Sequence, residues 1–235
     1  MGQHQELRTW EITELPPGRT AIGCRWVYAI KTKPDGEFEK AKARIVAQGF
    51  TQRPGMDYYD ITSPVVKFDS LRILLAIANT LNWEIEMMDI KGGYLHSMLE
   101  EEIYMHQPDR FNDGSGRVLK LRQALYGLKQ SGRTWHQCLR GLLLGLGFQQ
   151  SLADECVYIR QDKDSIEVIS VYVDDFRLFA DSKAGMIKLK GELNEKFQMT
   201  ELGEMKKILG IRIERDKKQG TLTMSQGHYI DVILA

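Results

Sequence analysis

Two adjacent aspartates between two apolar runs limit the folds open to this chain. Asp174 and Asp175 are preceded by the alternating run 166–171 and followed by a second apolar run, 176–180. β-Branched and aromatic residues in this pattern predict two strands of a hairpin with the acids at its tip. Neighbouring like charges disfavour their own ionisation unless a cation offsets them. The pattern therefore indicates a divalent-metal site or, as the plainer alternative, a solvated acidic turn.

A third acid supports the metal site. Asp89 ends the run 83–89, most of which alternates like a half-buried strand, and Gly92, Gly93 and Tyr94 follow soon after. Glycines at such a place allow a ligand or a second backbone to come close. Carboxylates are hard oxygen ligands that suit Mg²⁺ bound together with substrate phosphates. The combination predicts nucleotidyl transfer.

Several stretches occur in an order that belongs to a known family. They are CRWV at 24–27, KARIVAQGF at 42–50, SPVV at 63–66, DIK at 89–91, ALYGLKQ at 124–130, YVDD at 172–175 and LGI at 209–211. From about Trp10 to its end, the chain resembles the reverse transcriptase of copia-type LTR retrotransposons. A match of many motifs in order is far more specific than any one of them.

The resemblance implies a fold. Strands and helices interleave without a regular βαβ repeat, which favours an α+β class. In the family this is the polymerase right-hand fold, with fingers and an antiparallel-sheet palm. We expect fingers mainly in 10–82 and 117–150 and palm mainly in 83–116 and 151–235, within one reverse transcriptase region over 1–235. We expect no complete connection or RNase H region.

The resemblance also implies a reaction. It predicts an RNA-directed DNA polymerase that adds dNTPs to a primer 3′-hydroxyl by two-metal nucleotidyl transfer, with Mg²⁺ as cofactor and Mn²⁺ as a substitute. The catalytic residues would be Asp89, Asp174 and Asp175, and the metal ligands these three with the backbone carbonyl of Ile90. The alternative is a catalytically silent, domesticated module with the same fold that binds RNA or a protein partner.

Binding roles follow from the resemblance as well. The residues implied for dNTP binding are Lys42, Arg44, Gly93, Tyr94, Tyr126 and Gln130, with Tyr94 as a steric gate beneath the incoming sugar. Those implied for nucleic-acid binding are Lys120, Arg122, Arg133, Tyr172, Leu209 and Gly210. Plainer readings stay open: an exposed basic strand face, packed aromatic rings, and a glycine bulge where Leu209 and Gly210 resemble the primer-grip turn.

Charge is balanced overall but not locally. The chain has 32 Lys and Arg against 32 Asp and Glu, so its formal net charge is zero. From Arg117 to Arg140, however, basic residues occur with no acid among them. This stretch is either a phosphate track or a solvated face.

Composition suggests a cellular setting. Three cysteines without a CxxC pair favour a reducing compartment, and no apolar run approaches the length of a membrane span. We therefore expect a cytoplasmic protein, within virus-like particles if the resemblance holds, and no membrane partner. The expected partners are an RNA template with a DNA or RNA primer, and dNTPs; a homodimer is left open.

Local signals predict element boundaries. Segments 24–33 and 37–48 are typical of a long hairpin that bends at Pro34-Asp35-Gly36. Three helices are expected, one capped by Asp69 or Ser70, one capped by Ser131 and stopped by Gly147, and one opened by Ser182.

Three positions depart from the family pattern. Gly92-Gly93 replaces a commoner Thr-Ala, Gly132 stands where Pro is frequent, and Arg177 occupies a usually apolar position. None of these changes removes a carboxylate, so the expected reaction type is unaffected.

Overall fold

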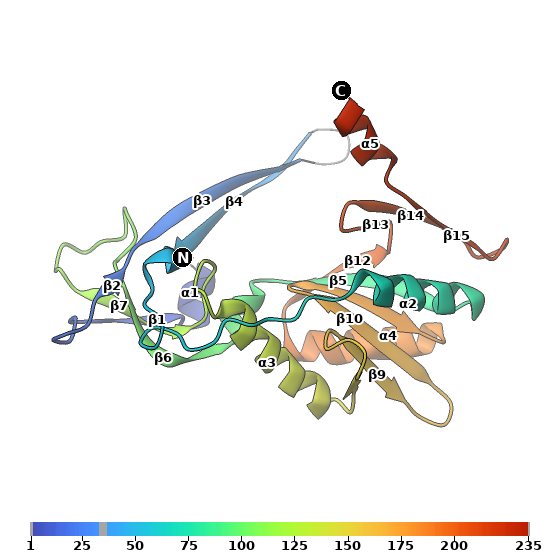
Figure 1. The fold of residues 1–235 in the computed structure, drawn as a ribbon, viewed down its shortest axis with the longest axis horizontal. Helices are drawn as coiled ribbons and strands as arrows, with labels where there is room; N and C mark the ends of the chain where they lie inside the picture. The colour runs from blue at the N-terminus through green and yellow to red at the C-terminus, as the bar shows by residue number, and fades with distance from the viewer. Residues whose placement is uncertain (1, 33–36, 235) are drawn as a thin grey trace. The chain divides into compact units, whose positions relative to one another are not determined.

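The computed structural model describes residues 2–32 and 37–234, without the side chains of residues 3, 32 and 228. The chain divides into two compact units. Unit 1 comprises residues 1–63 and 92–139, and unit 2 comprises residues 64–91 and 140–235. Figure 1 shows the elements of both units in chain order.

Unit 1 is mainly β-structure. Its elements are α1 (Gly2–Glu6), β1 (Trp10–Thr13), β2 (Ala21–Ile22), β3 (Cys24–Thr32), β4 (Phe38–Ala47), the 3-10 turns η1 (Gly49–Thr51) and η2 (Gly93–His96), β6 (Met98–Met105), β7 (Val118–Gln123) and the first part of α3 (Ser131–Gly145). The strands form a sheet in the order β1-β7-β6-β2 and a separate two-stranded hairpin, β3-β4. Apolar residues of β4, β6, β7 and the 125–128 segment make one buried cluster.

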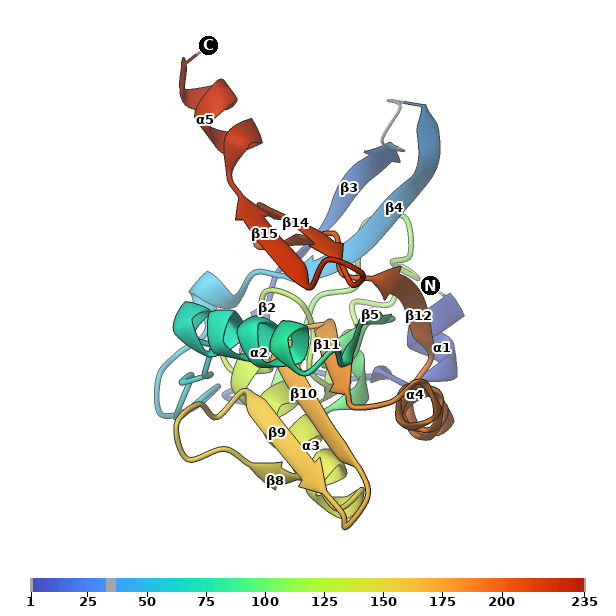
Figure 2. The same cartoon turned by 90° about the vertical axis from the view of Figure 1, so that its right-hand side faces the viewer.

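Unit 2 is a sheet with helices. Its elements are α2 (Phe68–Thr80), β5 (Glu84–Ile90), the end of α3, β8 (Gln149–Gln150), β9 (Val157–Gln161), β10 (Ile166–Tyr172), β11 (Asp175–Ala180), α4 (Lys183–Lys196), β12 (Met199–Glu204), β13 (Lys207–Ile208), β14 (Ile211–Asp216), β15 (Thr221–Ser225) and α5 (Gly227–Leu234). The main sheet runs β12-β5-β11-β10-β9-β8, and β13-β14-β15 form a smaller one. Figure 2 shows β9, β10, β11 and β5 side by side.

Each face of the main sheet in unit 2 has its own cover. Ile85, Val168 and Phe179 belong to one buried cluster with α2 and the β13-β14 hairpin. Side chains alternate along a strand, so Glu86 points to the opposite face. There Lys190 of α4 pairs with Glu86 at 2.8 Å. The sheet is therefore covered by α2 on one face and α4 on the other.

The α+β class is confirmed, and the main sheet is antiparallel as predicted. The hairpin β3-β4 follows the predicted segments, although its bend at 34–36 lies outside the described residues. Ser182 caps α4, since its side chain accepts a hydrogen bond from the Gly185 N–H. The division into fingers and palm stays a prediction.

Two predicted helix caps are wrong. Asp69 and Ser70 lie inside α2, because the N-cap is Lys67, whose N–H donates to Asp154 Oδ2 at 2.8 Å. Ser131 is the first residue of α3, and its hydroxyl donates backwards to the Leu125 carbonyl at 2.5 Å. At α2 the contact is distant in sequence, whereas at α3 it joins residues six apart. Gly147, with φ of 86°, does follow the end of α3 as predicted.

The cysteines behave as packed groups. All three are free thiols, and burial raises the pKa of Cys24 to about 11 and that of Cys156 to about 12. These two thiols are therefore protonated near neutral pH and poorly nucleophilic. Within the described residues, no helix is both long and apolar enough to cross a membrane.

Glycine is required where β4 meets the 124–130 segment. The Ala47 N–H donates to the Tyr126 carbonyl at 2.8 Å. Gly127 has φ of 94°, and a Cβ at that residue would lie 2.1 Å from the Ala47 carbonyl oxygen. No side chain fits so close to a backbone atom, which explains the glycine.

We predict that Gly127→Ala destabilises the protein by about 3 kcal/mol or more, through the positive φ and the backbone clash together. Urea denaturation monitored by circular dichroism measures the change. Gly141→Ala is the matched control, because nothing lies within 4 Å of its Cβ position. In the middle of α3 that change should stabilise by about 0.5–1 kcal/mol. Equal effects of the two substitutions would contradict the close approach.

Candidate active site

The pairing of β5 with β11 brings the predicted catalytic acids to one end of the sheet. Asp175 lies directly opposite Asp89, and on its other side opposite Tyr172. Residues opposite each other on neighbouring strands share a face, with Cα atoms about 4.5–5.5 Å apart. Asp174 lies in the two-residue loop beside them, and its carbonyl accepts a hydrogen bond from the Ile90 N–H at 3.0 Å. This bond ties the loop to the end of β5.

The loop between β10 and β11 is strained. Val173 has φ of 57°, in the left-handed region that β-branched residues rarely adopt. A positive φ at the first loop residue belongs to the tight turns of two-residue hairpins. This backbone conformation of Val173 costs about 1–2 kcal/mol of folding free energy. The strained residue lies directly beside Asp174.

The acid end has donors that fit Mg²⁺. Among the described residues, no three His, Cys, Asp or Glu side chains are grouped closely enough to hold a metal ion. Mg²⁺ does not need such a cage, because it is usually bound through one or two carboxylates together with phosphates and water. The facing pair Asp89 and Asp175, with Asp174 beside it, supplies hard oxygens of the right kind. Ile90 is buried at the end of β5, and the role of its carbonyl stays a prediction.

A buried cation lies beneath the acids, and sequence reasoning had noted it only as a departure from the family pattern. Arg177 is 1% exposed and lies two residues after Asp175, so both side chains are on the same face of β11. Its guanidinium carbon is 5.7 Å from the centroid of the Tyr172 ring. Burial lowers the pKa of Arg177, while Asp175 and Tyr172 act in the opposite direction.

In unit 1 the structure gathers three of the residues predicted to bind dNTP. The guanidinium carbon of Arg44 lies 5.5 Å from the centroid of the Tyr126 ring. The rings of Tyr126 and Tyr94 are 4.8 Å apart at 55°. Lys42 is two residues before Arg44 on β4, so it lies on the same strand face. Gly93 is buried and begins η2, the turn that holds Tyr94.

Gln130 belongs to a buried hydrogen-bond network. Its side chain is 1% exposed, and Nε2 donates to the Asp57 carbonyl at 2.8 Å. Its Oε1 accepts from Gln52 Nε2 at 3.0 Å, while Gln52 Oε1 accepts from the Lys129 N–H at 2.8 Å. Both ends of the Gln130 amide are thus used inside the protein. This geometry supports a scaffolding role, and its contact with dNTP stays a prediction.

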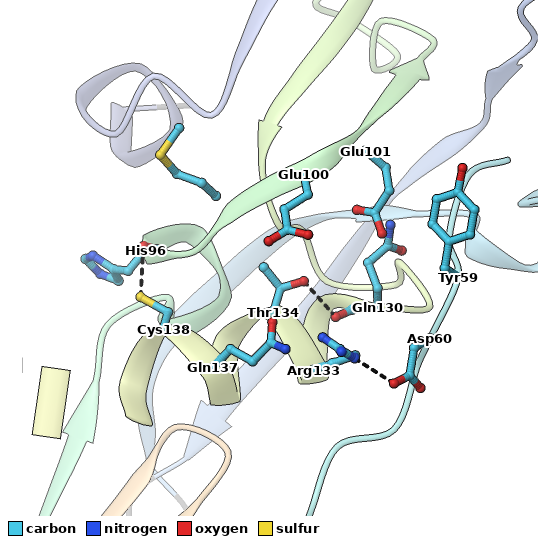
Figure 3. A pocket seen from close by; sticks show the side chains of 11 residues that line it. Tyr59, Asp60, His96, Glu100, Glu101, Gln130, Arg133, Thr134, Gln137 and Cys138 are labelled. Atoms are coloured by element: carbon cyan, nitrogen blue, oxygen red, sulfur yellow. Dashed lines mark hydrogen bonds and ion pairs between the residues drawn. The ribbon is translucent and has the colours of Figure 1, made fainter. Parts of the chain in front are cut away.

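A cavity of about 590 Å³ opens in unit 1 beside Gln130. Figure 3 shows Glu100 and Glu101 of β6 on one side of it and Arg133 of α3 on another, with Arg133 bonded to Asp60. Acids outnumber bases on these walls. Because phosphates are anionic, the cavity is not suited to a triphosphate.

The stretch 117–140 contains no acidic residue, but acids from other segments of the chain pair with its basic side chains. Lys120 pairs with Glu102 at 2.5 Å, Arg122 pairs with Glu11, and Arg133 pairs with Asp60 at 2.8 Å. The hydrogen bond from Arg133 lowers the pKa of Asp60, and that from Lys120 lowers the pKa of Glu102. Exposed pairs of this kind contribute little and exchange readily. The phosphate track therefore stays a prediction, one that requires these partners to be displaced.

Leu209 and Gly210 form a turn. They join β13 to β14 in the register Ile208 to Ile211, with φ of 47° and 85°. Two successive positive φ values are typical of a type I′ turn. Leu209 and Gly210 therefore form a hairpin turn and not a bulge within a strand, and their role as a primer grip stays a prediction.

Comparison with known proteins decides the family. The profile of the family described as "Reverse transcriptase (RNA-dependent DNA polymerase)" matches residues 7–235. The chain belongs to this reverse transcriptase family. The predicted resemblance to copia-type retrotransposons is confirmed, because the relatives of this chain are Pol polyproteins of such transposons.

Two plant relatives illustrate the similarity. The reverse transcriptase chain is 37% identical over 233 residues to the retrovirus-related Pol polyprotein from transposon TNT 1-94 of Nicotiana tabacum, covering 98% of the chain and 18% of the relative. It is 38% identical over 230 residues to that from transposon RE1 of Arabidopsis thaliana, covering 97% of the chain and 16% of the relative. The chain therefore spans less than a fifth of the length of these relatives.

A solved structure of the foamy viral protease-reverse transcriptase in complex with double-stranded DNA matches at 12% identity and a TM-score of 0.46. The match covers 98% of this chain and 34% of that one. A score this low supports no conclusion about the fold of this reverse transcriptase.

The Gln130 network generates a stability prediction. Gln130→Ala leaves the Asp57 carbonyl and the Gln52 amide buried without this partner, which should destabilise by about 2–3 kcal/mol. Gln137→Ala is the control, because Gln137 is exposed on the same cavity and should change stability by less than about 0.5 kcal/mol. Urea denaturation measures both. Unchanged stability with weakened nucleotide binding would instead assign Gln130 to direct contact.

Proposed function

We propose that this chain is an RNA-directed DNA polymerase that extends a primer on an RNA template by two-metal nucleotidyl transfer. The observation that carries the proposal is the register of β5 and β11, which sets Asp89 opposite Asp175 with Asp174 in the adjoining loop. Membership of the reverse transcriptase family supports it. The relatives are Pol polyproteins of transposons, a setting that fits virus-like particles as the place of the reaction.

The acids hold the cofactor in this proposal. Asp89, Asp174 and Asp175 would hold the Mg²⁺ ions. Bound metals lower the pKa of the attacking 3′-hydroxyl and stabilise charge on the attacking and leaving oxygens. The hydrogen bond from the Ile90 N–H to the Asp174 carbonyl supports this role, because it fixes the loop before substrate arrives.

The residues of unit 1 would bind the nucleotide. Lys42 and Arg44 share the face of β4 on which the basic side chains gather, and Arg offers two parallel hydrogen bonds to a phosphate. Arg44 is already positioned by its contact with the Tyr126 ring. Tyr94, packed on that same ring, would supply the wall that a 2′-hydroxyl meets.

We predict that Asp174→Asn lowers the rate of primer extension on RNA by at least about 100-fold and leaves the fold intact, because one charge is lost at nearly constant volume. Extension assays with Mg²⁺ measure the rate, and circular dichroism verifies the fold. Asp164→Asn, an exposed loop acid, is the control and should extend at the parent rate. Parental activity of the Asp174 variant, or no activity in the parent chain, would favour the catalytically silent binding module.

Tyr94→Val should raise ribonucleotide use relative to deoxyribonucleotide use, because a steric wall discriminates by repulsion rather than attraction. The ratio of kcat/KM values for the two substrates measures the change. Tyr94→Phe keeps the ring and its packing against Tyr126, so its ratio should match that of the parent. A constant ratio in the Val variant, together with a lower melting temperature, would identify Tyr94 as a packing residue.

A further inference from the structure

Arg177 is a buried charge that the proposed mechanism does not use. It lies at a rung of the main sheet where Met87 and Ser170 are its neighbours on either strand. Within the described residues it forms no ion pair, and its Nε and Nη1 atoms have no hydrogen-bond partner. Burying an unpaired charge costs desolvation free energy. A buried, unpaired arginine therefore needs a favourable interaction that offsets this cost.

A second arginine on the same sheet shows what a structural role looks like. Arg160 of β9 pairs with Glu167 at 2.5 Å and Glu192 at 2.6 Å, and donates to the Leu146 carbonyl at 2.8 Å. Its charge is locally neutralised. Among the residues that the structure describes, no carboxylate forms an ion pair with Arg177.

The charged neighbours of Arg177 are those at the acid end. Residues two apart on a strand are about 6.8 Å apart. The side chain extends toward that end, because its guanidinium carbon lies 5.7 Å from the ring of Tyr172, the residue directly opposite Asp175. At this separation the positive charge acts on Asp175 and on whatever Asp175 binds.

We propose that Arg177 is a positioning residue for metal binding: its buried positive charge offsets the repulsion among Asp89, Asp174 and Asp175 and weakens their affinity for divalent cations. This inference rests on the proposed function. It makes metal occupancy depend on added negative charge, which the phosphates of an incoming nucleotide supply. A weak site of this kind fills together with its substrate rather than before it.

The test is direct metal binding, free of any assay of catalysis. A unit charge about 8 Å from a divalent ion, at an effective dielectric constant of about 40, weakens binding by on the order of tenfold or more. Arg177→Met should therefore lower the Kd for Mn²⁺, measured by isothermal titration calorimetry, by about tenfold. Arg177→Lys keeps the charge and should stay within about twofold of the parent.

A control removes a distant charge from the same unit. Arg215 donates to the carbonyls of Trp83 and Ala78, next to the opposite end of β5 from Asp89. Arg215→Met should leave the Kd unchanged even if it lowers stability. Thermal unfolding with and without MgCl₂ gives a second readout, because a ligand stabilises in proportion to its affinity, and the Mg²⁺-induced rise in Tm should be larger for Arg177→Met than for the parent.

The outcomes separate this inference from the proposed function. If the parent binds Mn²⁺, Asp175→Asn abolishes binding and Arg177→Met binds no tighter than the parent, the metal site stands and the role of Arg177 is overturned. If neither the parent nor Arg177→Met binds Mn²⁺, the metal site fails and this inference fails with it. Binding by Arg177→Met alone would support the inference, since only removal of the charge then reveals the site.

Discussion

The antiparallel pairing of β5 with β11 is the constraint on which unit 2 depends. A slip of one residue would turn every side chain to the other face and separate Asp89 from Asp175. The slip is opposed far from the acids, because Ile85 and Phe179 pack under α2 while Glu86 pairs with Lys190 of α4. The apolar core thus fixes the register, and the register sets the acids opposite each other.

Many of the cations in the described part of the chain pair with acids. Several exposed cations pair with acids, as Lys120 does with Glu102, and the buried Arg160 pairs with two glutamates. A neutral protein can therefore carry many charges without a strong field around it. Arg177 differs from these cations, because it is buried in the sheet near the acids and forms no ion pair within the described residues.

Local order could be read from the sequence wherever short-range patterns decide it. The strand ending at Asp89, the hairpin of β10 and β11, and the cap at Ser182 follow from alternation and hydrogen-bond chemistry within a few residues. The caps at Asp69, Ser70 and Ser131 were wrong, because Asp154, far along the chain, binds the Lys67 N–H, and the Leu125 carbonyl takes the Ser131 hydroxyl away from the helix end. Local propensity is a weak prior against such contacts.

The sequence by itself determined the family and the order of the acids, since motifs and their spacing are properties of the chain alone. Only the tertiary structure decided which of these side chains are already engaged in contacts within the protein. It enclosed the Gln130 amide in a network with Gln52 and Asp57, placed acids against the basic stretch, and set Arg177 beneath Asp175. These outcomes depend on strand register and burial, which join residues far apart along the chain and leave no periodic signal in it.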